Sequence, residues 1–105
     1  MKTIVGLGKA GCNIADKFSQ YSQYEIYKID VGLEQSARCY NFPEFEALED
    51  YENRCPNFKK FFQGLSGEIL FVTSCGNISA ASLRILEYLK DTCEVSVLYI
   101  RPNRS

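Results

Sequence analysis

Apolar and β-branched residues gather in four short runs along the chain, and turn-forming residues bound each run. The runs cover residues 3–7, 24–30, 68–73 and 94–100. Short apolar runs are typical of strands buried in a parallel sheet, although the second run alternates between apolar and polar positions. The pattern therefore predicts four strands.

Two of the gaps between these runs carry apolar residues at helical spacing. One helix is expected to start at Gly11 and to continue through residues 12–18, and the other should cover residues 78–89. Asn77 or Ser79 could cap the start of the second helix, because either side chain can accept a hydrogen bond from a free backbone N–H.

The stretch between the second and third runs is the least regular part of the chain. Residues 31–50 show no clear period and are expected to form a long connection with one short helical turn at most. Residues 51–63 could form a helix, with Pro56 near its start or kinking it, and Gly64 is a natural end for that helix.

The order of these elements, in which strands alternate with helices, determines the expected fold class. Right-handed crossovers place the helices on the faces of a parallel sheet. We therefore expect an α/β fold, namely a three-layer Rossmann-like parallel sheet of about four strands with helices on both faces. With 105 residues, the chain should form a single domain (1–105) or a piece of a larger one.

The charge pattern restricts the class of partner. The net charge is −1 and the Lys and Arg residues are scattered, whereas a nucleic-acid-binding protein needs a basic face. The apolar run that follows Met1 is too short for a signal segment or a membrane span. We therefore expect a cytoplasmic protein that binds neither nucleic acid nor membrane.

The cysteines and the absence of histidine restrict the chemistry. The five cysteines are odd in number, widely spaced and without a Cys-x-x-Cys pair, which argues against a disulfide framework or a zinc site. The chain has no histidine, so metal sites and general bases that use histidine are excluded. Buried thiols in a reducing cytosol are the simplest interpretation. No catalytic or metal-ligating residue is predicted.

A glycine-rich turn follows the first predicted strand. Gly6, Gly8 and Gly11 form the pattern G-x-G-x-x-G between a strand and a helix. In this context glycines permit a tight turn, close approach of the backbone to a phosphate, and close packing of helix and strand. The free N–H groups and the positive end of the following helix point to the same place. The turn is therefore a candidate phosphate-binding loop.

Three more residues of this segment belong to the candidate site. Lys9 could add a charge-assisted contact to a phosphate, or it could be a solvated loop residue. Ala10 is included as part of the loop backbone. Asn13 is expected on the first turn of the helix, where its amide could meet a base, ribose or phosphate or could instead bond the local backbone.

A second turn of the same kind follows the third predicted strand. It contains Ser74, Gly76, Asn77 and Ser79 and leads into the helix expected at 78–89. In a doubly wound sheet, ligands lie beyond the carboxyl ends of the strands, so both turns should face one crevice. Two helix N-termini at this crevice would suit a di- or triphosphate better than either would alone, although helix capping also explains Asn77 and Ser79.

An acidic residue near the first turn supports an alternative ligand. Asp30 ends the second predicted strand about twenty residues after the glycine turn, where dinucleotide-binding folds place an acid on the ribose of NAD. An NAD- or FAD-binding Rossmann domain of an oxidoreductase therefore stays open as an alternative. A solvated aspartate at the end of a strand is the other explanation for Asp30.

These segments resemble the N-terminal nucleotide-binding subdomain of the FtsZ/tubulin-like GTPase superfamily. Four segments carry the likeness in the family's order, namely IVGLGKAGCN (4–13), YKID (27–30), FVTSCGNISAA (71–81) and VSVLYIRP (95–102). They are similar to the family's first phosphate loop, its second strand, its glycine-rich signature, and the strand after the signature helix. The order and spacing match over nearly the whole chain.

The resemblance implies a module that binds GTP or GDP, with or without Mg²⁺. Gly76 is the one glycine that stands where the family's signature has several. Hydrolysis in the family also needs acidic residues on a later loop, and the sequence ends at Ser105 without that loop. We therefore expect nucleotide binding without complete hydrolytic machinery, in a fragment or a reduced form of the family's domain.

A third interpretation is a degenerate, non-catalytic structural or interaction protein that has kept the fold and lost the ligand. The few glycines of the second turn favour it, whereas Asp30 and the intact first turn favour a nucleotide. A small parallel sheet also leaves one edge thinly covered, and exposed edges recruit partners. We therefore also expect a homo-oligomer or a protein partner.

Overall fold

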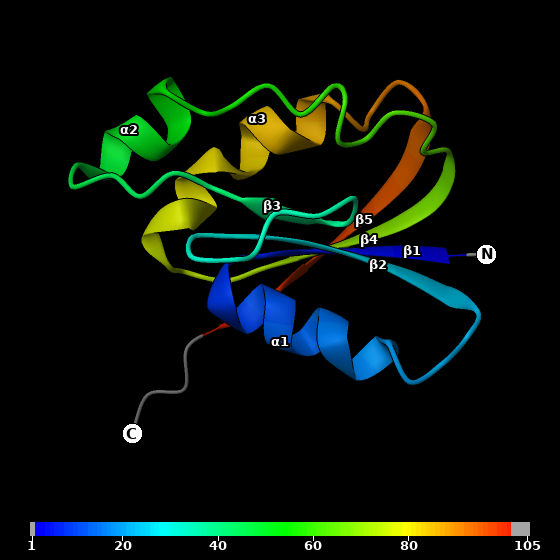
Figure 1. Ribbon diagram of the computed structural model, residues 1–105. Coiled ribbons are helices and arrows are strands. Elements are labelled where there is room, and N and C mark those ends of the chain that lie inside the picture. The colour runs from blue at the N-terminus through cyan, green and yellow to red at the C-terminus, as the bar shows by residue number, and fades with distance from the viewer. Residues whose placement is uncertain (1, 102–105) are drawn as a thin grey trace.

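The computed structural model describes residues 2–101, in which strands alternate with helices (Figure 1). The elements in chain order are β1 (Lys2–Leu7), α1 (Gly8–Phe18), β2 (Tyr24–Asp30), β3 (Cys39–Asn41), α2 (Leu48–Asn53), β4 (Gly67–Thr73), the 3₁₀ helix η1 (Asn77–Ala81), α3 (Ser82–Glu87) and β5 (Cys93–Tyr99). Within these residues, no helix has the length and apolar character needed to cross a membrane. Pro102, the last residue of the fourth segment compared above, lies outside the described residues.

The strands form one parallel sheet in the order β3-β2-β1-β4-β5. The central strand β1 pairs with β2 along its whole length and with β4 on its other side. The prediction of a Rossmann-like α/β fold is therefore confirmed. The sheet has five strands instead of about four, because the three-residue strand β3 is too short to leave a periodic pattern in the sequence.

Helices cover both faces of the sheet, so the fold has three layers (Figure 1). On one face α1 packs alone, and there Ile4, Ala15 and Val72 form a small buried cluster. On the other face lie α2, η1 and α3, together with the connecting segment 54–66. This second face holds the larger hydrophobic core, which includes Val5 and Phe71 from the central strands.

Aromatic rings form much of the larger core. Phe58 is fully buried, and its ring centroid lies 4.5 Å from that of Tyr40, 6.2 Å from that of Phe42 and 5.6 Å from that of Phe62. Because Phe42, Phe58 and Phe62 lie outside the helices and strands of the structure, the core over this face depends on tertiary packing more than on regular secondary structure.

The prediction of a helix over residues 51–63 is wrong. The helix in this region, α2, ends at Asn53, and the chain after it makes only short turns, in one of which the N–H of Phe62 donates to the carbonyl oxygen of Phe58. Pro56 explains the early end, because it lacks an N–H and disfavours helical backbone at the preceding residue. Gly64 ends the turn with a φ of +85°, as a helix-ending glycine would.

The two other predicted helices differ from the structure in their starts. The first helix, α1, begins at Gly8 instead of Gly11. The stretch 78–89 consists of η1 followed by α3, and neither Asn77 nor Ser79 caps it, because the N-cap residue is Gly76 and makes no side-chain capping bond. The second helix is therefore shorter and less regular at its start than the apolar stripe predicts.

Candidate functional site

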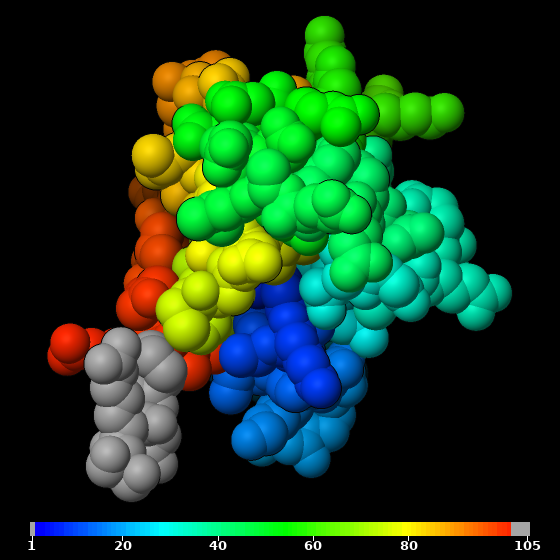
Figure 2. All heavy atoms as spheres, turned by 90° about the vertical axis from the view of Figure 1, so that its left-hand side faces the viewer, coloured from blue at the N-terminus to red at the C-terminus, as the bar shows by residue number. Residues whose placement is uncertain are grey.

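The two predicted turns lie side by side at one end of the sheet. They follow β1 and β4, which are neighbouring parallel strands, and Figure 2 shows them in contact, the first in blue and the second in yellow. Together they line a pocket of about 210 Å³. Its lining residues are Leu7, Gly8, Lys9, Ala10, Ser74, Gly76, Ile78 and Ser79. The prediction that both turns face one crevice is confirmed.

The three glycines of the first turn have different roles. Gly8 has a φ of +80°, which side chains rarely adopt, and it lets the chain pass from β1 directly into α1. Gly6 and Gly11 lie behind the pocket. A Cβ on Gly6 would lie 2.6 Å from the carbonyl oxygen of Gly11, and a Cβ on Gly11 would collide with the carbonyl oxygen of Val72. These two glycines therefore allow α1 to pack against β1 and β4.

The start of α1 offers backbone hydrogen-bond donors to the pocket. Its N-cap residue, Leu7, makes no side-chain capping bond, and the first N–H groups of any α-helix have no partner within the helix. Gly8, Lys9 and Ala10 belong both to this first turn and to the pocket lining. An anion in the pocket would therefore meet free N–H groups and the positive end of an 11-residue helix.

The second turn contributes less than the sequence predicts. It leads into η1, a 3₁₀ helix of 5 residues, so its dipole is weaker than that of α1. The hydroxyl of Ser79 donates to the carbonyl oxygen of Gly76 at 2.6 Å, and that of Ser74 donates to the carbonyl oxygen of Ile100 at 2.8 Å. Both hydroxyl protons are thus used within the protein, and the converging N-termini of two long helices are not found.

Among the described residues that line the pocket, Lys9 alone carries a charge. Its side chain is exposed, and none of the ion pairs found within residues 2–101 involves it. The remaining walls include the apolar residues Leu7, Ala10 and Ile78. The charge of a bound anion would therefore be compensated by Lys9 and by the backbone N–H groups of α1.

Besides Gly6 and Gly11, three more predicted site residues do not line the pocket. Asp30 lies at the end of β2, and its Oδ1 accepts a hydrogen bond from the N–H of Val31 at 2.8 Å. Burial raises the pKa of Asp30, while the Val31 hydrogen bond and the positive charge of Lys9 act in the opposite direction. Asn13 is exposed and falls on the second turn of α1, because the helix begins earlier than predicted. Asn77 is exposed as the first residue of η1.

Two pocket residues, Leu7 and Ile78, are absent from the sequence-based site. Their apolar side chains fit the hydrophobic pattern of the core, so the sequence assigns them to packing. A Cβ on Gly8 would lie 3.0 Å from Cγ2 of Ile78, which shows how closely the two turns approach each other. Only their positions in the sequence could have indicated that they belong to the site, because each is adjacent to a predicted site residue.

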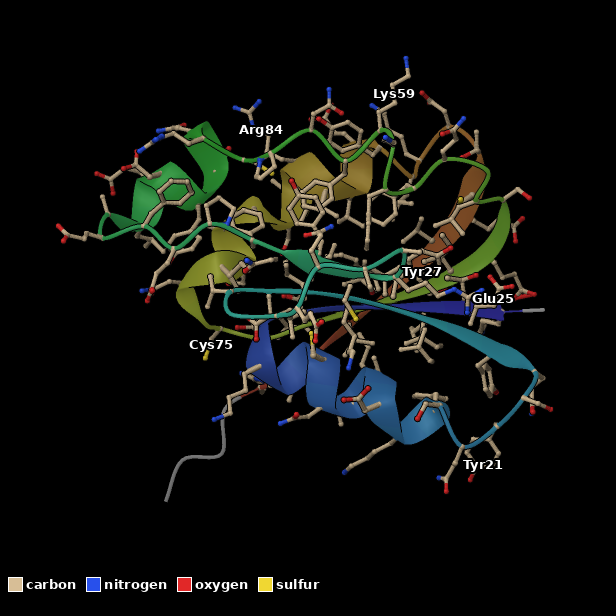
Figure 3. The ribbon with its side chains drawn as sticks, in the orientation of Figure 1. Tyr21, Glu25, Tyr27, Lys59, Cys75 and Arg84 are labelled. Atoms are coloured by element: carbon tan, nitrogen blue, oxygen red, sulfur yellow. The ribbon has the colours of Figure 1, made fainter. Side chains whose placement is uncertain are left out.

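Two cysteines lie near the site and differ in accessibility. Cys12 is buried behind the first turn, with its Sγ 3.5 Å from the carbonyl oxygen of Gly6 and 3.6 Å from that of Ile29. Burial raises the pKa of Cys12 to about 12, so its thiol stays neutral. Cys75 lies on the second turn and is exposed (Figure 3). The prediction of buried thiols therefore holds for Cys12 but not for Cys75.

Neither potential metal ligands nor similarity to known proteins gives a further assignment. Within residues 2–101, no group of three or more His, Cys, Asp or Glu is placed to hold a metal ion. No protein-family model, no curated protein and no solved structure matches the chain. The geometry of the fold and of the pocket is therefore the basis for a functional proposal.

Proposed function

We propose that this chain is a cytoplasmic nucleotide-binding module that holds the phosphates of GTP or GDP between the two turns and acts through self-association or a partner protein. One observation carries the proposal: the start of α1 and the second turn line a common pocket, and Lys9 lies at that pocket. A helix N-terminus with free N–H groups and an adjacent lysine is a suitable environment for phosphate.

The size of the pocket indicates which part of the nucleotide it would hold. Its volume of about 210 Å³ lies below the roughly 300–1,000 Å³ of pockets that enclose whole ligands. It therefore suits the phosphates, with the ribose and base outside on the surface. Mg²⁺, where present, would be held mainly by phosphate oxygens and water, as is usual for this ion in nucleotide sites.

The choice of GTP or GDP comes from the resemblance to FtsZ/tubulin-like GTPases, and the chain would bind without the family's complete hydrolytic machinery. Asp30 supports NAD as the second candidate. Its carboxylate ends β2, the strand next to β1, where dinucleotide-binding folds place the residue that meets the ribose. Both candidate ligands would place their phosphates in the same pocket, and they differ in the part of the molecule that lies outside it.

A nucleotide panel in a thermal unfolding assay separates these candidates. A ligand at a hundred times its dissociation constant stabilises a fold by about 2.7 kcal/mol, which corresponds to roughly 10–20 °C for a domain of this size. GTP and GDP should raise the melting temperature, and NAD and FAD should not. A shift with NAD alone would select the oxidoreductase alternative, and no shift with any nucleotide would select the degenerate protein.

A pair of lysine variants localises the ligand. Lys9→Met should weaken nucleotide binding about ten- to hundredfold, because a charge-assisted contact is lost. Lys17→Met is the matched control, since Lys17 is exposed in the last turn of the same helix. Equal loss of binding in both variants would show that the nucleotide does not bind at the pocket.

A further inference from the structure

The strand β5 forms an open edge of the sheet. It is the last strand in the order β3-β2-β1-β4-β5, so it has a neighbouring strand on one side only. Large apolar side chains are exposed on it: Val97, Leu98 and Tyr99 are 55%, 43% and 51% exposed. In Figure 2 this strand (orange to red) runs along one side of the molecule.

The opposite edge, β3, is protected by the chain itself. The N–H of Ser36 donates to the carbonyl oxygen of Cys39 at 2.9 Å, and the Oγ of Ser36 accepts from the N–H of Cys39 at 3.1 Å. The Oε1 of Gln35 accepts from the N–H of Asn41 at 2.8 Å. Within residues 2–101, no hydrogen bond outside the ladder with β4 involves residues 95–99. Among the residues that the structure describes, none therefore gives the edge of β5 the cover that proteins usually give an edge strand.

The hydrogen bonds of Ile100 identify the backbone groups that face the open edge. Its N–H donates to the carbonyl oxygen of Thr73, and its carbonyl oxygen accepts from the hydroxyl of Ser74, so both groups point towards β4. Backbone groups of successive strand residues alternate in direction. The N–H and C=O groups that point away from β4 are therefore those of Val95, Val97 and Tyr99.

We propose that β5 pairs with β5 of a second copy of this chain, antiparallel, about a two-fold axis that passes through Val97. In this register Val97 lies opposite Val97 of the second copy, and Val95 lies opposite Tyr99. Each opposed pair exchanges both N–H···O bonds, so every outward-facing group of these three residues is paired. Cys93 cannot extend the series, because its N–H already donates to the carbonyl oxygen of Leu89 at 3.0 Å.

The side chains fit this register. Successive side chains of a strand point to opposite faces, so those of Val95, Val97 and Tyr99 share one face. On that face Val95 already packs against the larger core. Pairing brings the two Val97 side chains together and places each Tyr99 against Val95 of the other copy. Glu94, the one charged residue of β5, lies opposite Ile100, so no like charges meet.

The inference rests on the self-association part of the proposed function and is independent of nucleotide. Light scattering over a concentration series should give twice the chain mass of 12.0 kDa. Val97→Lys should give the mass of a single chain, because two lysines would face each other across the axis. Tyr21→Lys is the matched control, since Tyr21 is 49% exposed just before β2, a strand that β1 and β4 separate from β5, and this variant should remain a dimer.

A charge-swap experiment tests the register itself. Val97→Glu alone should also be a single chain, whereas a mixture of Val97→Lys and Val97→Glu should recover a dimer that contains one copy of each. Circular dichroism establishes that each variant is folded. A wild-type chain that stays at 12.0 kDa, a Val97→Lys variant that still dimerises, or a mixture that stays monomeric overturns the proposal. The nucleotide panel can be repeated on Val97→Lys, so a failure of dimerisation is distinguishable from a failure of nucleotide binding.

Discussion

The contact between β1 and α1 can be tested with a single methyl group on Gly6. A Cβ at this position would lie 2.6 Å from the carbonyl oxygen of Gly11, 2.8 Å from its carbonyl carbon and 3.0 Å from the Cα of Cys12. All three atoms belong to the backbone of α1, so no side-chain rotation relieves the overlap. In Gly6→Ala the helix must therefore move away from the sheet.

The expected cost follows from this geometry. Overpacking a core costs about 1–3 kcal/mol, and the upper end applies because a whole helix must shift. Gly6→Ala should thus lose about 3 kcal/mol from a total stability of about 5–15 kcal/mol, which lowers the melting temperature by roughly 12–24 °C. Far-UV circular dichroism during urea or thermal unfolding is the suitable signal, since the chain has no tryptophan.

Gly76→Ala is the control for this prediction. A Cβ on Gly76 would have no neighbouring atom within 4 Å, and its φ of −64° is accessible to any residue. The control should therefore stay within about 0.5 kcal/mol of the wild type. Wild-type stability in Gly6→Ala would refute the close packing of α1 on β1, and an equal loss in both variants would show that the turns, and not this contact, limit stability.

Three further changes probe the core, the strand end and the second turn. Phe58→Ala should lower the free energy of unfolding by about 3–5 kcal/mol in a urea titration, because a fully buried ring is lost. Burial raises the pKa of Asp30, so Asp30→Asn should stabilise the fold at pH values above this raised pKa. The gain should decline as the pH falls and should be gone below about 3.9, the pKa of an unfolded aspartate, as thermal unfolding at neutral and acidic pH will show. A thiol reagent should modify Cys75 first, because this cysteine is exposed. Mass spectrometry should show one adduct that forms fast, is absent in Cys75→Ser, and forms more slowly when nucleotide is bound.

The main strands, and the position of the two turns at one pocket, could be predicted from the sequence. Short apolar runs that are bounded by turn-forming residues are compatible with few structures other than buried strands. The runs at 3–7 and 68–73 correspond to β1 and β4 within a residue. Once a parallel sheet is inferred, the residues after its strands must lie at one end. The neighbouring positions of β1 and β4 then bring the two turns into one pocket.

The region between Asp30 and β4 could not be predicted, for a physical reason. Its rings are spaced irregularly, and their positions depend on contacts with rings distant in sequence, such as that of Phe58 with Tyr40. The start of α1 was missed for a different reason. A glycine at positive φ can begin a helix immediately after a strand, and the pattern of apolar residues does not report this.

The division of roles within G-x-G-x-x-G decides how much the motif says about ligand binding. Gly6 and Gly11 are required by backbone packing, so a degenerate protein of the same fold would need them as much as a nucleotide-binding one. Lys9 is different, because it is exposed and has no ion-pair partner within residues 2–101. Its replacement should leave stability unchanged without ligand and reduce only the shift that a nucleotide produces. The comparison of Lys9→Met with Gly6→Ala therefore separates a site that binds phosphate from a turn that only packs.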